Sequence, residues 1–164
     1  MGWLGVWGFV GRMASESGKV YFEWGIEGVS EMVEGVYVYS ESFEVEGSWF
    51  RLQYGRIKRD GREAFGLFLA YDLPKNKVVD FCVKVESQFY VRNMFTNEME
   101  ATHLPSLDTY DRKHVNLGYF DPLKRSWGEL VGSGSIHVAL DDTMVVGVMV
   151  KALDKLAGSV EILK

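Results

Sequence analysis

The chain has 164 residues, of which 47% are hydrophobic and 25% charged, so it suits one globular domain and not a disordered chain. Its formal net charge of −5 argues against a nucleic-acid partner, because phosphate neutralisation requires a clustered basic surface. Aromatic residues make up 14% and are interspersed with 18 glycines, a composition that favours an all-β domain.

The cysteine content bears on the cellular compartment. Cys82 is the only cysteine, which excludes an internal disulfide, and the sequence has no Asn-x-Ser/Thr acceptor for N-glycosylation. Both features fit a reducing environment, so we expect an intracellular, cytoplasmic protein. Residues 2–10 are apolar but too few to cross a bilayer, and no basic segment precedes them, so we expect neither a membrane span nor a secretory signal.

The first residues differ in composition from the rest of the chain. Residues 1–18 are predicted to be a glycine-rich apolar arm and linker, followed by the domain at residues 19–153 and a tail at residues 154–164. We expect the arm to pack on this domain or on a partner, because it offers the large apolar side chains Trp3, Leu4, Val6, Trp7 and Phe9.

The domain itself shows no long stretch of helical periodicity. Short segments rich in aromatic and β-branched residues predict strands at residues 20–26, 36–45, 48–54, 65–72, 78–85, 89–95, 136–140 and 143–152. Glu46-Gly47 and Asp60-Gly61 predict turns, residues 56–62 a basic loop, and residues 96–114 a long polar loop. The pattern predicts antiparallel strands in a two-layer β-sandwich.

Several motifs, taken in order, resemble the MATH (meprin and TRAF homology) domain family. An aromatic-x-Trp-x-Ile strand at residues 22–26 precedes a Ser-x-x-Phe-x-Val-x-Gly segment at 40–47 and Trp49-x-x-Leu52. Residues 65–69 match a Leu-Ser-Leu-Tyr-Leu strand of the family. Tyr119-Phe120, Trp127-Gly128 and the closing Leu140-x-Asp142-Thr143-x-Val145 then follow. The resemblance spans residues 21–153 and implies an eight-stranded antiparallel sandwich, TRAF/MATH-like, that binds an extended peptide of a partner protein at a sheet edge.

The resemblance also implies a binding site. Phe68 stands at the family's tyrosine pocket wall, Tyr119 at the aromatic before a turn, and Glu129 where the family has another aromatic. The implied peptide-binding residues are Phe68, Val83, Tyr119, Arg125, Ser126, Trp127, Gly128 and Glu129. With a carboxylate at position 129, we expect either a preference for Lys, Arg or Ser on the ligand or a loss of peptide binding.

The residues alone leave other interpretations open. Val83 lies in the apolar phase of its predicted strand, which favours a core position. Tyr119 and Trp127 are as consistent with the core as with the floor of a binding site. The basic side chains near residue 60 form either a solvated hairpin or a docking patch for an acidic partner: Arg51, Arg56, Lys58, Arg59 and Arg62.

Catalysis and cofactor binding find little support in the sequence. The three histidines lack metal-ligand spacing, and one cysteine cannot build a zinc cluster. Asp108 and Asp111 near His114 form the only local polar constellation, and a surface loop explains it equally well. We therefore predict a non-enzymatic protein without a cofactor.

Two functions remain open. One is an adaptor or scaffold that binds an extended peptide. The other is a structural subunit of a larger assembly, which packs through the sandwich and the amino-terminal arm. A third possibility, self-association through the arm or through the trimer surface that TRAF-type members use, also stays open, although the sequence has no heptad repeat for the coiled coil that drives those trimers.

Overall fold

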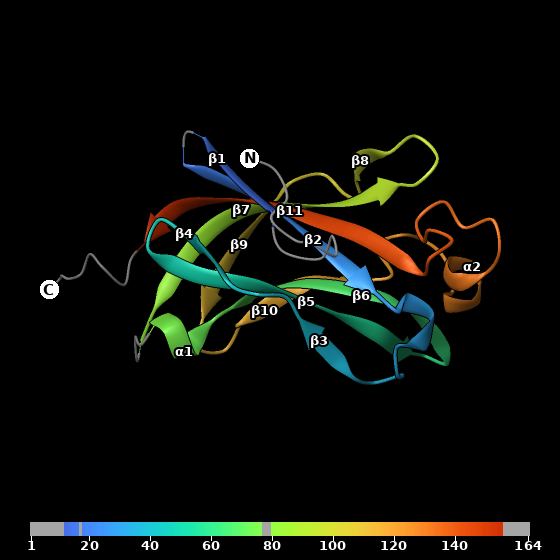
Figure 1. The fold of residues 1–164 in the computed structure, drawn as a ribbon. Helices are drawn as coiled ribbons and strands as arrows, with labels where there is room; N and C mark the ends of the chain where they lie inside the picture. The colour runs from blue at the N-terminus through green and yellow to red at the C-terminus, as the bar shows by residue number, and fades with distance from the viewer. Residues whose placement is uncertain (1–11, 17, 77–79, 156–164) are drawn as a thin grey trace, which may run out of the picture.

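The computed structural model describes residues 12–16, 18–76 and 80–155. Within them the protein is a sandwich of two antiparallel sheets, which confirms the predicted all-β sandwich architecture (Figure 1). The short helices α1 (Leu73–Asn76) and α2 (Trp127–Val131) lie at opposite ends of the sandwich (Figure 1). The apolar arm at residues 1–11 and most of the predicted tail lie outside the described residues, so their roles stay predictions.

The larger sheet has six strands. Its order is β1 (Arg12–Glu16), β2 (Lys19–Glu27), β11 (Thr143–Lys155), β7 (Cys82–Asn93) and β8 (Glu98–Ala101), and β9 (Ser106–Asp111) also pairs with β7. β1 pairs with β2 and occupies residues that the sequence predicted as a linker. β11 continues two residues past the predicted domain boundary at 153.

The smaller sheet has five strands. Its order is β10 (Asn116–Phe120), β6 (Arg62–Tyr71), β5 (Ser48–Arg59) and β3 (Tyr37–Tyr39), and β4 (Phe43–Val45) also pairs with β5. A 3-10 turn, η1 (Val29–Glu31), follows β2. β10 and β3 are therefore the two end strands of this sheet, a position that matters for the site below.

Alternating side chains direct one face of each strand into the core. Phe22 of β2 and Phe43 of β4 are buried, and their rings stack with centroids 4.4 Å apart between the two sheets. Tyr110 of β9 is fully buried, and its hydroxyl donates a hydrogen bond to the Leu69 carbonyl at 3.1 Å. Full burial of side chains of this size contributes about 1.5–3 kcal/mol each, provided that polar tips find partners, as this hydroxyl does.

The predicted basic loop at residues 56–62 is wrong. β5 and β6 form a continuous hairpin whose strands reach Arg59 and Arg62. Only Asp60 and Gly61 form the turn, both with positive φ (52° and 78°), as a two-residue hairpin of this hand requires. Charged side chains suggested a loop, but cross-strand pairing accommodates them on exposed positions of the hairpin.

Other predicted boundaries also differ from the structure. Residues 82–85 and 89–93 of the strands expected at 78–85 and 89–95 belong to one strand, β7, and residues 78–79 lie outside the described residues. The expected long loop at 96–114 contains β8 and β9. The strand expected at 36–45 is interrupted at Ser40, whose hydroxyl accepts a hydrogen bond from the Leu52 N–H. Residues 136–140 form no strand. The implied count of eight strands is not confirmed, since the described residues form eleven.

Candidate functional site

The end strand β10 leaves one of its edges unpaired among the described strands. At its ends, Tyr71 N–H donates to the Val115 carbonyl at 2.7 Å, and Asp121 N–H donates to the Phe65 carbonyl at 2.9 Å. In an antiparallel ladder, the residues whose peptide groups bond the neighbouring strand alternate with residues whose groups point the other way. The N–H and C=O groups directed away from β6 are therefore those of Asn116, Gly118 and Phe120.

Gly118 lets β10 approach β6 unusually closely. A Cβ atom at this position would lie 2.3 Å from the Leu67 carbonyl oxygen and 2.5 Å from the Cα of Phe68, so no side chain fits without a backbone shift. The same Cβ would lie 3.0 Å from Cδ2 of the Phe68 ring. Phe68 therefore leans over the exposed Gly118 on the outer face of the sheet, toward the unpaired edge.

Tyr119 faces the opposite side of the sheet from Phe68. Its half-buried ring stacks on the imidazole of His103 with centroids 3.7 Å apart, and it meets Phe89 of β7 edge to face at 5.9 Å. Phe68 and Tyr119 lie on opposite faces because of the strand register. Phe68 is paired with Gly118, and Tyr119, the next residue of β10, directs its side chain to the inner face. Phe68 and Tyr119 thus flank the β10 edge from its two sides and do not share one pocket.

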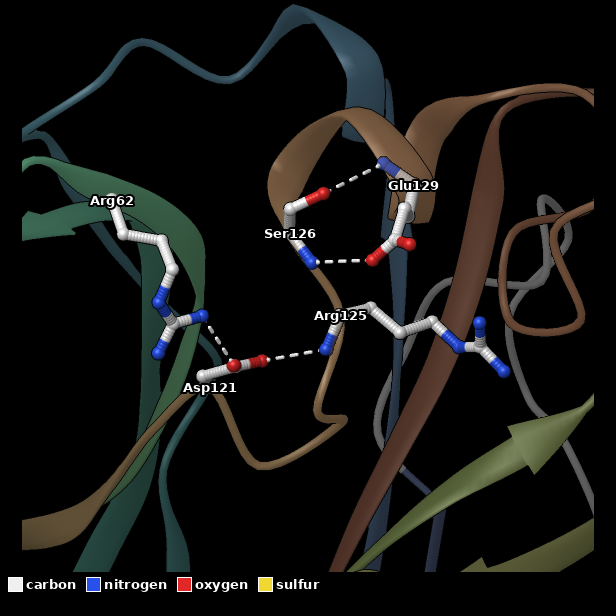
Figure 2. A network of polar contacts seen from close by, with 5 residues as sticks. All are labelled: Arg62, Asp121, Arg125, Ser126 and Glu129. Atoms are coloured by element: carbon white, nitrogen blue, oxygen red, sulfur yellow. Dashed lines mark hydrogen bonds and ion pairs between the residues drawn. The ribbon is translucent and has the colours of Figure 1, made fainter.

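Asp121 fixes the chain just after β10 (Figure 2). Its side chain is 9% exposed, and its carboxylate accepts hydrogen bonds from Nη1 of Arg62 at 2.6 Å and from the Arg125 N–H at 2.9 Å. The guanidinium groups of Arg59 and Arg62 also lie over the Phe120 ring, 5.2 and 5.0 Å from its centroid. The end of β10 therefore carries an aromatic ring framed by two cationic groups.

The turn of helix α2 is held by a capping box (Figure 2). The Ser126 hydroxyl accepts from the Glu129 N–H at 3.3 Å, and the Glu129 carboxylate accepts from the Ser126 N–H at 3.0 Å. This reciprocal pair satisfies two donors that a helix start leaves open. Glu129 is exposed, and its carboxylate is hydrogen-bonded to the Ser126 N–H within the same helical turn.

No protein-family model matches the chain, and no curated protein matches it significantly. Function therefore has to be inferred from the residues themselves and their geometry.

The predicted site residues do not form a single groove. Trp127 is 6% exposed and Val83 1% exposed, so both pack in the core, and Val83 lies in the other sheet opposite Tyr110 of β9. As open pocket walls, these two do not fit the structure, because the apolar phase of the strand and the buried face of α2 direct them inward. Phe68 and Tyr119 flank the β10 edge. Arg125 and Ser126 are partly exposed in the segment after it, and Gly128 and Glu129 are exposed on α2.

Sequence reasoning missed three contributors to this region: His103, Asp121 and the capping function of Glu129. The Ser-x-x-Glu spacing of residues 126–129 is a recognisable capping signature that indicates a helix start. Asp121 is followed by proline, a pair that is common at turns. No signal in the sequence pointed to the stacking of His103 on Tyr119, since the two residues are brought together only by the packing of the sheets.

Two histidines near this region favour the neutral form. Burial, reinforced by the positive charge of Lys124, lowers the pKa of His103 below its ordinary value. Burial also lowers the pKa of His137; Arg125 adds to that shift, while a hydrogen bond to the Arg92 backbone and the charge of Glu100 oppose it. The Arg125 side chain points away from Asp121 (Figure 2), and the bond between the two residues is made by the Arg125 peptide N–H.

Of the polar residues considered for catalysis, Asp111 and His114 belong to one turn, and Asp108 lies within β9. Oδ1 of Asp111 lies 3.0 Å from Nδ1 of His114 and also accepts from two backbone N–H groups of the turn. This contact with His114 lowers the pKa of Asp111. Asp108 accepts from the Ser106 hydroxyl instead. The described residues contain no cluster of three or more His, Cys, Asp or Glu that could hold a metal ion.

The basic side chains of the β5–β6 hairpin are engaged locally. Arg56 pairs with Glu63 at 2.7 Å, Arg62 pairs with Asp121, and the Arg51 guanidinium lies 3.9 Å from the centroid of the Tyr39 ring. These contacts distribute the charges over both faces of the sheet. They favour the solvated hairpin over a single docking patch.

A hollow of about 920 Å³ lies at the α2 end of the sandwich, apart from the β10 edge. Its lining is mainly apolar and includes the exposed side chains of Phe95 and Leu140. None of the predicted site residues lines it. No helix in the described ranges is both long enough and apolar enough to cross a membrane.

Proposed function

We propose that this protein is a non-enzymatic, MATH-type interaction module that binds an extended segment of a partner protein along β10, as an adaptor or scaffold. The single observation that carries the proposal is the unpaired β10 edge, flanked by Phe68 on one face and Tyr119 on the other.

The backbone of β10 supplies the binding groups. Asn116, Gly118 and Phe120 present N–H and C=O groups outward at alternate positions, which is the pattern that an added antiparallel strand requires. An extended peptide gains affinity from these main-chain hydrogen bonds, and its side chains then alternate between the two faces of the sheet.

Selectivity would come from the flanking side chains. A peptide residue opposite Gly118 places its side chain on the outer face, where the absence of a glycine side chain leaves the Phe68 ring within reach. We propose an apolar or aromatic residue at that position. Residues on either side of it would point toward Tyr119 and His103 on the other face.

The two-sheet architecture is compatible with the proposed resemblance to the MATH family. When β3 and β4 are counted as one interrupted strand, and β1 and β8 are set aside as additions, eight strands remain in two antiparallel sheets. Phe68 and Tyr119 are two of the residues that the resemblance implies for peptide binding. They lie on the adjacent strands β6 and β10, at the edge of one sheet.

The alternative function is a structural subunit of a larger assembly. The burial of Trp127 and Val83 favours it, because two of the expected pocket walls are used for packing. In that case partners would contact surfaces away from β10, such as the hollow around Phe95 or the residues of the amino-terminal arm.

The two functions are separated by comparing partners captured with the full chain and with single variants. Phe68→Ala removes the ring beside the edge, and Asn116→Pro removes an outward N–H without removing a backbone bond to β6. Asn116→Ala, which keeps the N–H, accounts for the side-chain hydrogen bond that Asn116 donates to Gln53 at 2.8 Å. Phe95→Ala is the matched control, since it removes an exposed phenylalanine elsewhere. We expect partners to be lost with Phe68→Ala and Asn116→Pro and kept with Phe95→Ala. Partners that persist with folded Phe68→Ala and Asn116→Pro, and disappear with Phe95→Ala, would overturn the proposal.

A further inference from the structure

The opposite end strand of the same sheet is unusually apolar on its surface. Among the described residues, twelve large hydrophobic side chains are exposed, and five of them fall within residues 33–39: Val33, Val36, Tyr37, Val38 and Tyr39. We call this segment the β3 edge. Natural end strands are commonly blocked by lysine, proline or a bulge, and an unblocked apolar edge marks an interaction surface. The β3 edge contains neither lysine nor proline.

The backbone of β3 is also open on one side. Ser40 N–H donates to the Leu52 carbonyl at 2.9 Å, so by alternation Val38 directs its peptide groups toward β5. Tyr37 and Tyr39 therefore direct theirs away from the sheet. No described strand pairs with β3 on that side.

The tyrosine side chains leave this open side uncovered. The Tyr39 ring lies beneath the guanidinium group of Arg51, 3.9 Å away, and its hydroxyl accepts from the Gln53 amide at 3.2 Å. The Tyr37 ring meets Phe68 edge to face at 6.2 Å. Both rings are thus held on the outer face of the sheet, where they extend the apolar surface without blocking the strand's hydrogen-bonding edge.

Charge identifies the kind of partner. Between Lys19 and Arg51 the chain has seven glutamates and no lysine, arginine, aspartate or histidine. Glu31 and Glu34 are exposed just before β3, and Glu44 is exposed on β4, which pairs with β5 further along the same edge. The nearest cations are engaged, Arg51 with Tyr39 and Arg56 with Glu63.

We propose that the β3 edge is a second docking surface, for an extended segment of a partner protein whose apolar residues are flanked at both ends by lysine or arginine. Main-chain pairing with β3 would place the apolar residues beside the tyrosine rings. The flanking basic residues would then lie near Glu34, which precedes β3, and near Glu44, which follows it on the same outer face. A second copy of this chain fits less well, because pairing two β3 edges would bring like charges together. The β3 edge and β10 lie at opposite ends of the sheet, although Phe68 contacts residues of both. Asn116→Pro and Tyr37→Pro each remove an outward N–H from one edge only, so these two variants distinguish failure of one proposal from failure of the other.

The test uses the full chain and a short blocked peptide of valines with lysine at both ends, and binding is followed by amide NMR and isothermal titration. We expect protection and shifts at the Tyr37 and Tyr39 amides, with those of Asn116, Gly118 and Phe120 unchanged. A valine–glutamate peptide should not bind. Tyr37→Pro, which removes an outward N–H, should abolish binding.

Charge reversal at the edge provides the electrostatic arm of the test. Glu34→Lys/Glu44→Lys should weaken binding of the basic peptide at least about tenfold. Glu98→Lys/Glu100→Lys on β8 makes the same net change elsewhere and should alter affinity less than about twofold. The proposal is overturned if both double variants weaken binding equally, if the acidic peptide binds as well, if neither peptide binds, or if the chain itself associates through Tyr37 and Tyr39.

Discussion

The imidazole of His103 lies flat on the ring of Tyr119, with centroids 3.7 Å apart and ring planes inclined by 6°. The stack joins the loop after β8 to the end strand of the opposite sheet, and it closes the sandwich beside β10. Because burial favours the neutral imidazole, the stability of this closure depends on pH.

The protein should lose stability as the pH falls below about 6.5. His103 and His137 have lowered pKa values in the folded state, so the unfolded chain takes up protons first as the solution is acidified. Their contribution is complete above the unfolded pKa and is lost as the pH falls toward the folded values. Urea midpoints between about pH 7.5 and about pH 5 measure it. His103→Gln/His137→Gln should flatten this decline, and an unchanged slope would contradict the assignment.

Substitutions at two glycines should have opposite effects. Gly118→Ala introduces a Cβ within 2.3 Å of a carbonyl oxygen and should destabilise the fold by about 1–3 kcal/mol. Gly128→Ala, in the exposed first turn of α2, meets nothing within 4 Å and should stabilise it by about 0.5 kcal/mol. Thermal unfolding of the two variants tests the pair. Equal melting temperatures would mean that β10 lies further from β6 than the structure shows.

Asp121 should be the carboxylate whose loss is most costly near β10. Asp121→Ala removes the acceptor of the Arg125 N–H and of Arg62 and leaves alanine at a φ of 58°, so we expect a loss of about 2–3 kcal/mol. Asp121→Asn tolerates that φ and keeps an acceptor, and should cost about 1 kcal/mol. Asp80→Asn is the control: its contact with Arg112 is well exposed, and little change is expected. Denaturant titration compares the three.

The capping box predicts a graded effect at α2. Ser126→Ala removes the hydroxyl that accepts from Glu129 N–H, and should cost about 1 kcal/mol. Glu129→Gln keeps an acceptor for the Ser126 N–H, whereas Glu129→Ala removes it, so the alanine variant should be the less stable. If an aromatic residue at position 129 instead raises both stability and peptide affinity, the capping role of Glu129 is secondary to a lost binding role.

Much of the architecture follows from local patterns. The alternation in residues 20–26 and 65–69 gave the inward faces of β2 and β6, and Glu46-Gly47 and Asp60-Gly61 gave the two tight turns. The lengths of the strands could not be predicted from these local patterns, because pairing with a neighbouring strand extends a strand through polar residues. Arg56, Lys58 and Arg59 lie in β5 for this reason, although their composition is that of a loop.

The candidate site was predictable only in part. A single aromatic can be assigned to a strand, but its exposure depends on what the opposite sheet places against it. The sequence did not distinguish a core position for Trp127 from a pocket wall, and only the orientation of α2 shows that its side chain points inward. The contact between Tyr119 and His103 depends on how the two sheets pack, which the sequence does not reveal. Phe68, whose neighbours Leu67 and Leu69 are buried, was the residue whose outward direction the alternation did indicate.

The position of β11 has a consequence for how the molecule folds. This strand, the last in the described sequence, lies between β2 and β7 and pairs with both (Figure 1). Before β11 is synthesised and paired, β2 and β7 each lack a hydrogen-bonding neighbour on the edge that β11 later occupies. These two strands therefore cannot yet belong to one continuous sheet. Contacts between residues so distant in sequence slow folding. The partly folded chain would therefore expose two unpaired strand edges, and chaperone demand should be greatest before residues 143–155 are in place.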